Sequence, residues 1–125
     1  MDNRLKVLGI VGSLRKGSYN KALIQAATKL LPRNATIEVV YLTEFPPFNQ
    51  DLEHTPPEVV KQFKTKIHAT DAILIASPEY NYSIPGVLKN AIDWGSRPHG
   101  ENAFDGKPVA VMRASIGKFG GARMQ

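Results

Sequence analysis

The chain has 125 residues, of which 42% are hydrophobic, and it contains no cysteine. This length suits one compact domain, and the lack of cysteine excludes disulfides, thiolate metal sites and cysteine nucleophiles. Sixteen Lys and Arg against eleven Asp and Glu give a net charge of +5, which favours an anionic partner without identifying it. Because no apolar stretch approaches the roughly 20 residues that cross a bilayer, we expect no membrane partner, no signal peptide and a cytoplasmic protein.

The first half of the sequence predicts two strands and the helix between them. Residues 5–11 are apolar at nearly every position after their start, which is typical of a strand covered on both faces of a parallel sheet. A second strand is predicted at residues 36–42. Residues 20–31 predict a helix, which Pro32 and Asn34 end. Its apolar face is predicted to consist of Leu23, Ala26, Ala27, Leu30 and Leu31.

The second half continues the same alternation. Residues 55–58, with the sequence TPPE, predict a capping box and proline at the first position of a second helix. A strand is predicted at residues 71–76, a third helix opening at Pro85, and a fourth strand at residues 108–112. The predicted core residues of the two helices are Val60, Phe63, Ile67, Ile84, Leu88, Ala91 and Ile92. The order β-α-β-α-β-α-β predicts a doubly wound α/β sheet with right-handed crossovers.

This fold class predicts where a ligand binds. In open parallel sheets the ligand lies beyond the carboxyl ends of the strands, where the strand order reverses. The segments that follow the predicted strands are residues 12–20, 43–53, 77–85 and 113–121. These four segments are therefore the candidate binding loops.

The first of these loops, with the sequence GSLRKGSYN, has the composition of a phosphate site. Ser13, Ser18 and Asn20 can donate hydrogen bonds, Arg15 can form a charge-assisted pair, and the helix start offers unpaired N–H groups. A plain Ser or Asn helix cap is the alternative. A Walker loop is excluded because Ser18 stands where its lysine should be, and the glycine spacing does not fit a dinucleotide fingerprint. The loop therefore favours a single terminal phosphate.

The third and fourth loops suit a flat heterocycle. Residues 77–86 contain two tyrosines and Asn81 between two prolines, so apolar planes and polar groups stand in a pinned loop. A proline-bounded connection whose tyrosines only cover the sheet edge is the alternative. Residues 115–123 are rich in glycine, which suits either close approach to a ring or ordinary tight turns.

Other chemistries find little support in the sequence. His54, His68 and His99 lack metal-ligand spacing, so no metal site is predicted. Glu79 has no second carboxylate in its loop, which argues against acid–base catalysis. Lys and Arg are scattered rather than interleaved with aromatic residues, so no nucleic-acid partner is expected.

Four segments together carry a family resemblance. GSLRKGSYN, FPPFNQDLE, SPEYNYSIPGVLKNAIDW and GKPVAVMRASIGKFGGAR resemble the NADPH-dependent FMN reductase family, closest to its soluble quinone, chromate and azo-compound reductases. The resemblance implies a flavodoxin-like fold of strand order 2-1-3-4-5 that holds FMN non-covalently. It also implies hydride transfer from NADPH or NADH through the flavin to quinones, chromate, azo compounds or free flavin, with no catalytic side chain.

The resemblance further implies which residues bind the cofactor and how the chain assembles. We expect a homodimer or homotetramer, and the FPPFNQDLE loop either covers the cofactor or builds the dimer. A non-catalytic flavin- or phosphate-binding module is the alternative function. The predicted cofactor-binding residues are Ser13, Arg15, Ser18, Tyr19, Asn20, Pro78, Glu79, Tyr80, Asn81, Tyr82, Ser83, Ser115 and Gly117.

The family pattern extends past the last residue of this sequence, through a helix, a fifth strand and a final helix. We therefore expect residues 1–125 to form a flavodoxin-like domain shortened at its C-terminal side, with strand order 2-1-3-4. An uncovered fourth strand favours edge pairing, and we expect FMN affinity and activity to be impaired relative to a longer chain.

Overall fold

The alternation predicted from the sequence is present along the chain. A computed structural model describes residues 4–118 and 120–124. In chain order the elements are β1 (Leu5–Val11), α1 (Tyr19–Leu30), β2 (Ala35–Tyr41), the 3-10 turn η1 (Gln50–Leu52), α2 (Glu58–Ala69), β3 (Ala72–Ala76), α3 (Gly86–Ser96), β4 (Val109–Met112) and the 3-10 turn η2 (Ala122–Met124).

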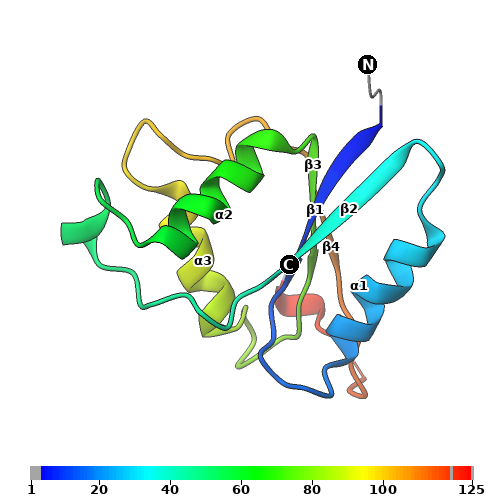
Figure 1. Ribbon diagram of the computed structural model, residues 1–125. Coiled ribbons are helices and arrows are strands. Elements are labelled where there is room, and N and C mark those ends of the chain that lie inside the picture. The colour runs from blue at the N-terminus through cyan, green and yellow to red at the C-terminus, as the bar shows by residue number, and fades with distance from the viewer. Residues whose placement is uncertain (1–3, 119, 125) are drawn as a thin grey trace.

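The four strands form one parallel sheet in the order β2-β1-β3-β4. The chain moves from β1 to β2 on one side and then crosses back to β3 on the other. Because crossovers are right-handed, this reversal puts α1 on one face of the sheet and α2 and α3 on the opposite face (Figure 1). The predicted doubly wound α/β fold is confirmed, and the strand order reverses between β1 and β3.

The core lies on both faces of the sheet, which explains why β1 is apolar almost throughout. Leu8 and Ile10 join the cluster beneath α2 and α3, whose members include Phe63 and Ile67. Val11 joins a smaller cluster under α1. Successive side chains of a strand point to opposite faces, so both sets are withdrawn from water only because helices cover both faces.

The predicted apolar face of α1 is wrong in part. Ile24 is fully buried although the prediction omitted it, whereas Leu30, which the prediction included, is 82% exposed. The stripe facing the sheet begins with Asn20, which is also buried, and Ile24 follows at the helical spacing of four residues. The spacing of apolar residues alone does not identify this buried stripe, because its first member is polar.

The predicted capping box before α2 is also wrong. The N-cap is Pro57, no side chain caps the helix, and the first helical residue is Glu58. Thr55 and Pro56 each precede a proline, which disfavours the helical conformation at both, and Pro57 itself has a ψ of 155°, outside the helical region. The helix therefore begins after both prolines, beyond the reach of Thr55.

The segment between β2 and α2 is attached to α3. Asn90 accepts a hydrogen bond from the Phe48 N–H at 2.7 Å, and its Nδ2 donates to the Pro46 carbonyl at 2.8 Å. The Trp94 Nε1–H also donates to the Pro46 carbonyl, at 2.8 Å. Arg97 Nε donates to a Glu53 carboxylate oxygen at 2.8 Å. Residues 45–53 are thus tied to α3 through Pro46 and Phe48, and to its C-cap residue through Glu53.

Replacing Asn90 by alanine should loosen this attachment. The Phe48 N–H loses its acceptor, whereas the Pro46 carbonyl keeps the bond from Trp94, so we expect the free energy of unfolding to fall by about 1–3 kcal/mol. Protease should then cleave residues 45–53 faster than in the parent protein. The control is Lys89→Ala, which removes an exposed ion pair to Asp93 and should change stability by less than about 1 kcal/mol. Equal cleavage rates in the two variants would contradict the attachment.

Candidate functional site

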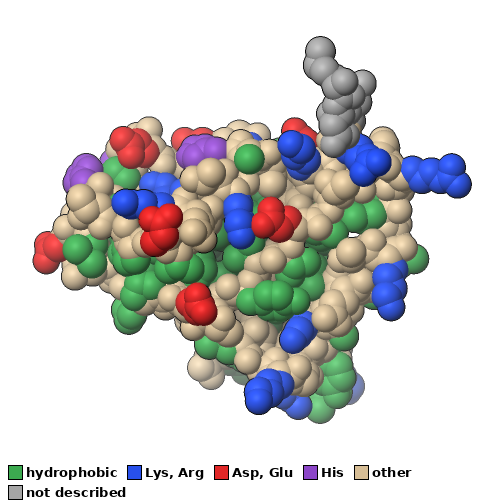
Figure 2. All heavy atoms as spheres, viewed as in Figure 1, with side chains coloured by type: hydrophobic (Ala, Val, Ile, Leu, Met, Phe, Trp, Pro, Cys, Tyr) green, Lys and Arg blue, Asp and Glu red, His purple; other side chains and the backbone are tan. Residues whose placement is uncertain are grey.

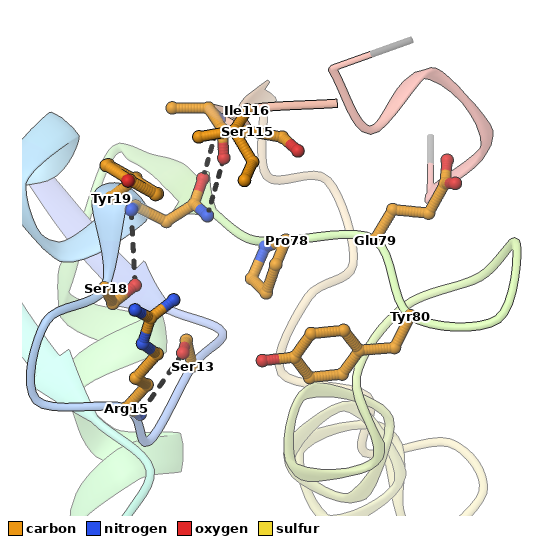
Figure 3. Close-up of a pocket in the computed structure, with 11 residues that line it drawn as sticks. Ser13, Arg15, Ser18, Tyr19, Pro78, Glu79, Tyr80, Ser115 and Ile116 are labelled. Carbon is orange, nitrogen blue, oxygen red and sulfur yellow. Dashed lines mark hydrogen bonds between the residues drawn. The ribbon is translucent and has the colours of Figure 1, made fainter. Parts of the chain in front are cut away.

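A cavity of about 240 Å³ opens at the carboxyl ends of β1, β3 and β4, next to the point of strand reversal. Its wall comes from three loops, those after β1, β3 and β4 (Figure 3). This is the position that doubly wound sheets use for ligands. The lining residues are Ser13, Arg15, Ser18, Tyr19, Asn20, Pro78, Glu79, Tyr80, Ala114, Ser115 and Ile116.

The loop between β1 and α1 gathers hydroxyl and cationic groups on one side of this cavity. The Arg15 N–H donates to Ser13 Oγ at 3.3 Å, and the Ser18 N–H donates to the Arg15 carbonyl at 3.2 Å. These bonds fold the loop back on itself. In Figure 3 the Arg15 guanidinium points toward Ser18, on the same side of the cavity as Ser13. One cation and two hydroxyls therefore converge there.

Ser18 also caps α1, so the cap that was the alternative reading of this loop exists. Its Oγ accepts from the N–H groups of Asn20 and Lys21 at 3.2 and 3.3 Å. Two of the helix-start donors expected to be unpaired are thus already engaged, at distances toward the long end of the hydrogen-bond range. The Ser18 oxygen acts as acceptor in both bonds, so its hydroxyl hydrogen stays available to an anion.

Gly12 and Ser77 bring the first and third loops into close approach. The Gly12 N–H donates to the Ala76 carbonyl at 2.8 Å, and the Ser77 N–H donates to the Met112 carbonyl at 3.1 Å. A Cβ on Gly12 would lie 2.8 Å from Ser77 Cβ, closer than real side chains come. The sequence analysis did not identify this contact, although two small residues directly after adjacent strands are a signal for it.

The loop after β3 places its residues in two groups. Pro78, Glu79 and Tyr80 line the cavity, and the Tyr80 ring points across it toward Ser13 (Figure 3). Tyr80 and Ser83 then exchange both backbone hydrogen bonds, at 2.9 and 3.0 Å, around a two-residue turn. The turn residues are Asn81 and Tyr82, whose φ values are +52° and +66°. Both φ values are positive, as a type I′ turn requires, and neither turn residue lines the cavity.

Glu79 is oriented by the segment that follows the fourth loop. Its carboxylate accepts from the Arg123 N–H at 2.6 Å, and Figure 3 shows Glu79 pointing away from Arg15. The Arg123 guanidinium lies 4.4 Å from the centre of the Tyr82 ring. The negative charge of Glu79 is therefore directed away from the cationic side of the cavity.

The loop after β4 contributes the third wall. Ser115 and Ile116 line the cavity together with Ala114, and Ile116 is 89% exposed. Ser115 Oγ accepts from the Gly117 N–H at 3.0 Å, which closes a tight turn. Phe119, part of the predicted glycine-rich loop, lies outside the described residues. Ala114 and Ile116 were not among the predicted site residues, although both lie in the candidate binding loop that follows the fourth strand.

The structure thus brings together most of the predicted site residues and leaves some apart. The predicted residues in the cavity wall come from all three loops. The predicted residues outside it belong to the turn after Tyr80 or to the loop after β4. In the wall are Ser13, Arg15, Ser18, Tyr19, Asn20, Pro78, Glu79, Tyr80 and Ser115. Outside it are Asn81, Tyr82, Ser83 and Gly117.

The charge distribution beyond the cavity is mixed. Figure 2 shows Lys and Arg spread over the upper, right-hand and lower parts of the visible face, including the lower end where the β1–α1 loop lies in Figure 1. Within residues 4–118 and 120–124, no three His, Asp or Glu side chains gather as a metal site. In the same part of the chain, no helix has the length and hydropathy to cross a membrane.

Fold and cavity together define a doubly wound α/β protein of the flavodoxin-like type. The sequence matches the family described as NADPH-dependent FMN reductase over residues 5–125. An NAD(P)H-dependent FMN reductase of Pseudomonas aeruginosa is 52% identical over 126 residues, which cover all of this chain and 68% of the relative. The chain therefore belongs to the NADPH-dependent FMN reductase family.

Two further relatives agree with this membership. An NAD(P)H:quinone oxidoreductase of Solanum tuberosum is 50% identical, and the alignment covers 97% of this chain and 63% of that relative. The chain also resembles the solved structure of FerB, a flavoenzyme NAD(P)H:(acceptor) oxidoreductase from Paracoccus denitrificans. The sequences are 42% identical, the TM-score is 0.91, and the match covers 97% of this chain and 66% of the FerB chain. The chain spans about two thirds of the length of these relatives.

Proposed function

We propose that this chain binds FMN in the cavity at the strand reversal and acts as an NAD(P)H-dependent reductase of quinone-type acceptors. The observation that carries the proposal is the convergence of Ser13, Arg15 and Ser18 on one side of a cavity whose other side holds Pro78 and Tyr80. One side supplies hydroxyl and cationic donors, and the other supplies an apolar plane. A flavin mononucleotide needs both within one site.

The residues present fit this cofactor. A single terminal phosphate matches a loop that has one guanidinium and two hydroxyls but lacks the lysine of a Walker loop. Arg15 is assigned to neutralise the phosphate charge, and Ser13 and Ser18 to donate hydrogen bonds to it. The rotation of Glu79 toward the Arg123 N–H keeps a second negative charge away from that phosphate.

On the side of the cavity assigned to the flavin ring, the chain orients and shields that ring. Pro78 and Tyr80 offer flat apolar surface, and the Ser115 segment forms the third wall. When bound, FMN supplies the two-electron chemistry that links NAD(P)H to an acceptor. The side chains of this site are assigned to binding and orientation, so the proposal names no catalytic acid or base. Quinones are the favoured acceptors because relatives of 46% and 50% identity are named quinone reductases.

A spectrum tests the proposal directly. The purified protein, incubated with FMN and desalted, should retain the flavin absorption bands. Anaerobic NADPH or NADH should bleach them, and a benzoquinone should restore them. Retained flavin that neither donor bleaches would support the non-catalytic flavin-binding module instead. A folded sample that retains no flavin would refute FMN binding. The predicted homodimer or homotetramer is tested on the same sample by light scattering.

A further inference from the structure

Asn20 joins two segments of the cavity wall that lie 94 residues apart in the sequence. Its Nδ2 donates to the Ala114 carbonyl at 3.3 Å, and the Ala114 N–H donates to its Oδ1 at 3.0 Å. Asn20 is only 2% exposed. Both ends of one buried amide are therefore engaged by the backbone of a single residue of the loop after β4.

The position of Ala114 explains what this pairing does. The ladder between β3 and β4 ends at the pair Ala76 and Met112, and one more bond runs from the Ser77 N–H to the Met112 carbonyl. Ala114 lies beyond that ladder. The Asn20 amide directs one N–H donor and its oxygen acceptor at the Ala114 backbone, as a neighbouring strand would, so Asn20 continues the pairing of the chain past the end of β4.

Each side of this pairing continues into the cavity wall. Ser18 and Tyr19 directly precede Asn20, and Ser115 and Ile116 directly follow Ala114. The spacing between the phosphate side and the Ser115 segment is thus fixed by two hydrogen bonds to one side chain. Removing the Asn20 amide would leave the Ala114 N–H and carbonyl without these partners at the edge of the site.

We propose that Asn20 is a positioning residue, which holds the Ser115 segment at the correct distance for the flavin ring, and that it is not a phosphate ligand. This inference rests on the proposed function. The two roles predict different ligand dependence, because riboflavin has the ring of FMN without its phosphate. A positioning residue affects the affinity for both flavins, whereas a phosphate ligand affects the affinity for FMN alone.

The experiment measures the dissociation constants of FMN and riboflavin for the parent chain, Asn20→Ala and Arg15→Ala by quenching of flavin fluorescence. Asn20→Ala should weaken both flavins by about the same factor, about fivefold to tenfold, because two hydrogen bonds are lost. The circular dichroism of the bound flavin should change as well, since the ring environment shifts. The matched variant Arg15→Ala should weaken FMN alone. A loss confined to FMN in Asn20→Ala, or no loss for either flavin, would overturn the proposal.

A second measurement separates this proposal from the proposed function and needs no variant. Hydrogen exchange of the Ala114 amide, followed by NMR in the parent chain, should be slow relative to the intrinsic exchange rate of an unprotected amide, because Asn20 Oδ1 accepts its hydrogen. Fast exchange at Ala114 would overturn the positioning role even where flavin binds. If the parent chain binds neither flavin, the proposed function fails, and with it the role of Asn20 toward the ring.

Discussion

Arg15→Ala is expected to weaken FMN binding by about tenfold to a hundredfold. A charge-assisted hydrogen bond to a phosphate is stronger than a neutral one, and its removal leaves the phosphate charge facing only hydroxyl donors. Arg15 is exposed, so solvent screening favours the lower part of that range. The measurement is titration of the apoprotein with FMN at fixed ionic strength.

Lys16→Ala is the matched control for this prediction. Lys16 is the next residue along the chain and carries the same charge, but it does not line the cavity. If Arg15 acts through a direct contact, the control should lower FMN affinity by less than about threefold, as expected for screened surface charge. Equal losses in the two variants would indicate general attraction by the basic loop instead of a phosphate contact.

Gly12→Ala is expected to destabilise the fold and the site together. A Cβ at this position would lie 2.6 Å from Ser77 Oγ, 2.8 Å from Ser77 Cβ and 3.3 Å from Ser77 Cα. Ser77 cannot move aside easily, because it is fully buried and its N–H donates to the Met112 carbonyl. Forcing an extra carbon into such a contact lowers the free energy of unfolding by about 1–3 kcal/mol. Chemical denaturation measures this change.

Two further variants make the Gly12 prediction specific. Gly86→Ala introduces the same methyl group where nothing lies within 4 Å of the new Cβ, so its unfolding free energy should stay within about 0.5 kcal/mol of the parent value. Adding Ser77→Gly to Gly12→Ala removes the two closest atoms and should recover most of the lost stability. The single variant Ser77→Gly is measured as the reference. A double variant whose loss of stability equals the summed losses of Gly12→Ala and Ser77→Gly would show that the contact with Ser77 is not the cause.

The strand and helix order was predictable because the signals for it are local. Apolar runs such as residues 5–11 and prolines at helix boundaries act within a few residues, and they predicted every strand to within one or two residues. The start of α2 was wrong because two opposing local rules met there. Thr55 suggested a cap, but the effect of Pro57 on the conformation of Pro56 prevailed.

The candidate site was predictable only at the level of its loops. The residue types in the loops after β1 and β3 indicated binding of an anion and of a flat ring, and most of those residues line one cavity. What the sequence did not reveal depends on contacts between distant segments. The hydrogen bonds of Asn20 to Ala114 and the close approach of Gly12 to Ser77 depend on how three strand ends, far apart in the sequence, pack together.

The attachment of residues 45–53 to α3 has a practical consequence, because Trp94 is the sole tryptophan of the sequence. Its indole is 1% exposed, donates to the Pro46 carbonyl and meets the Phe48 ring edge-on with 5.0 Å between ring centres. The tryptophan emission of the protein therefore comes from one known place. A red shift at denaturant concentrations below the main transition would report release of this segment alone, without any introduced label.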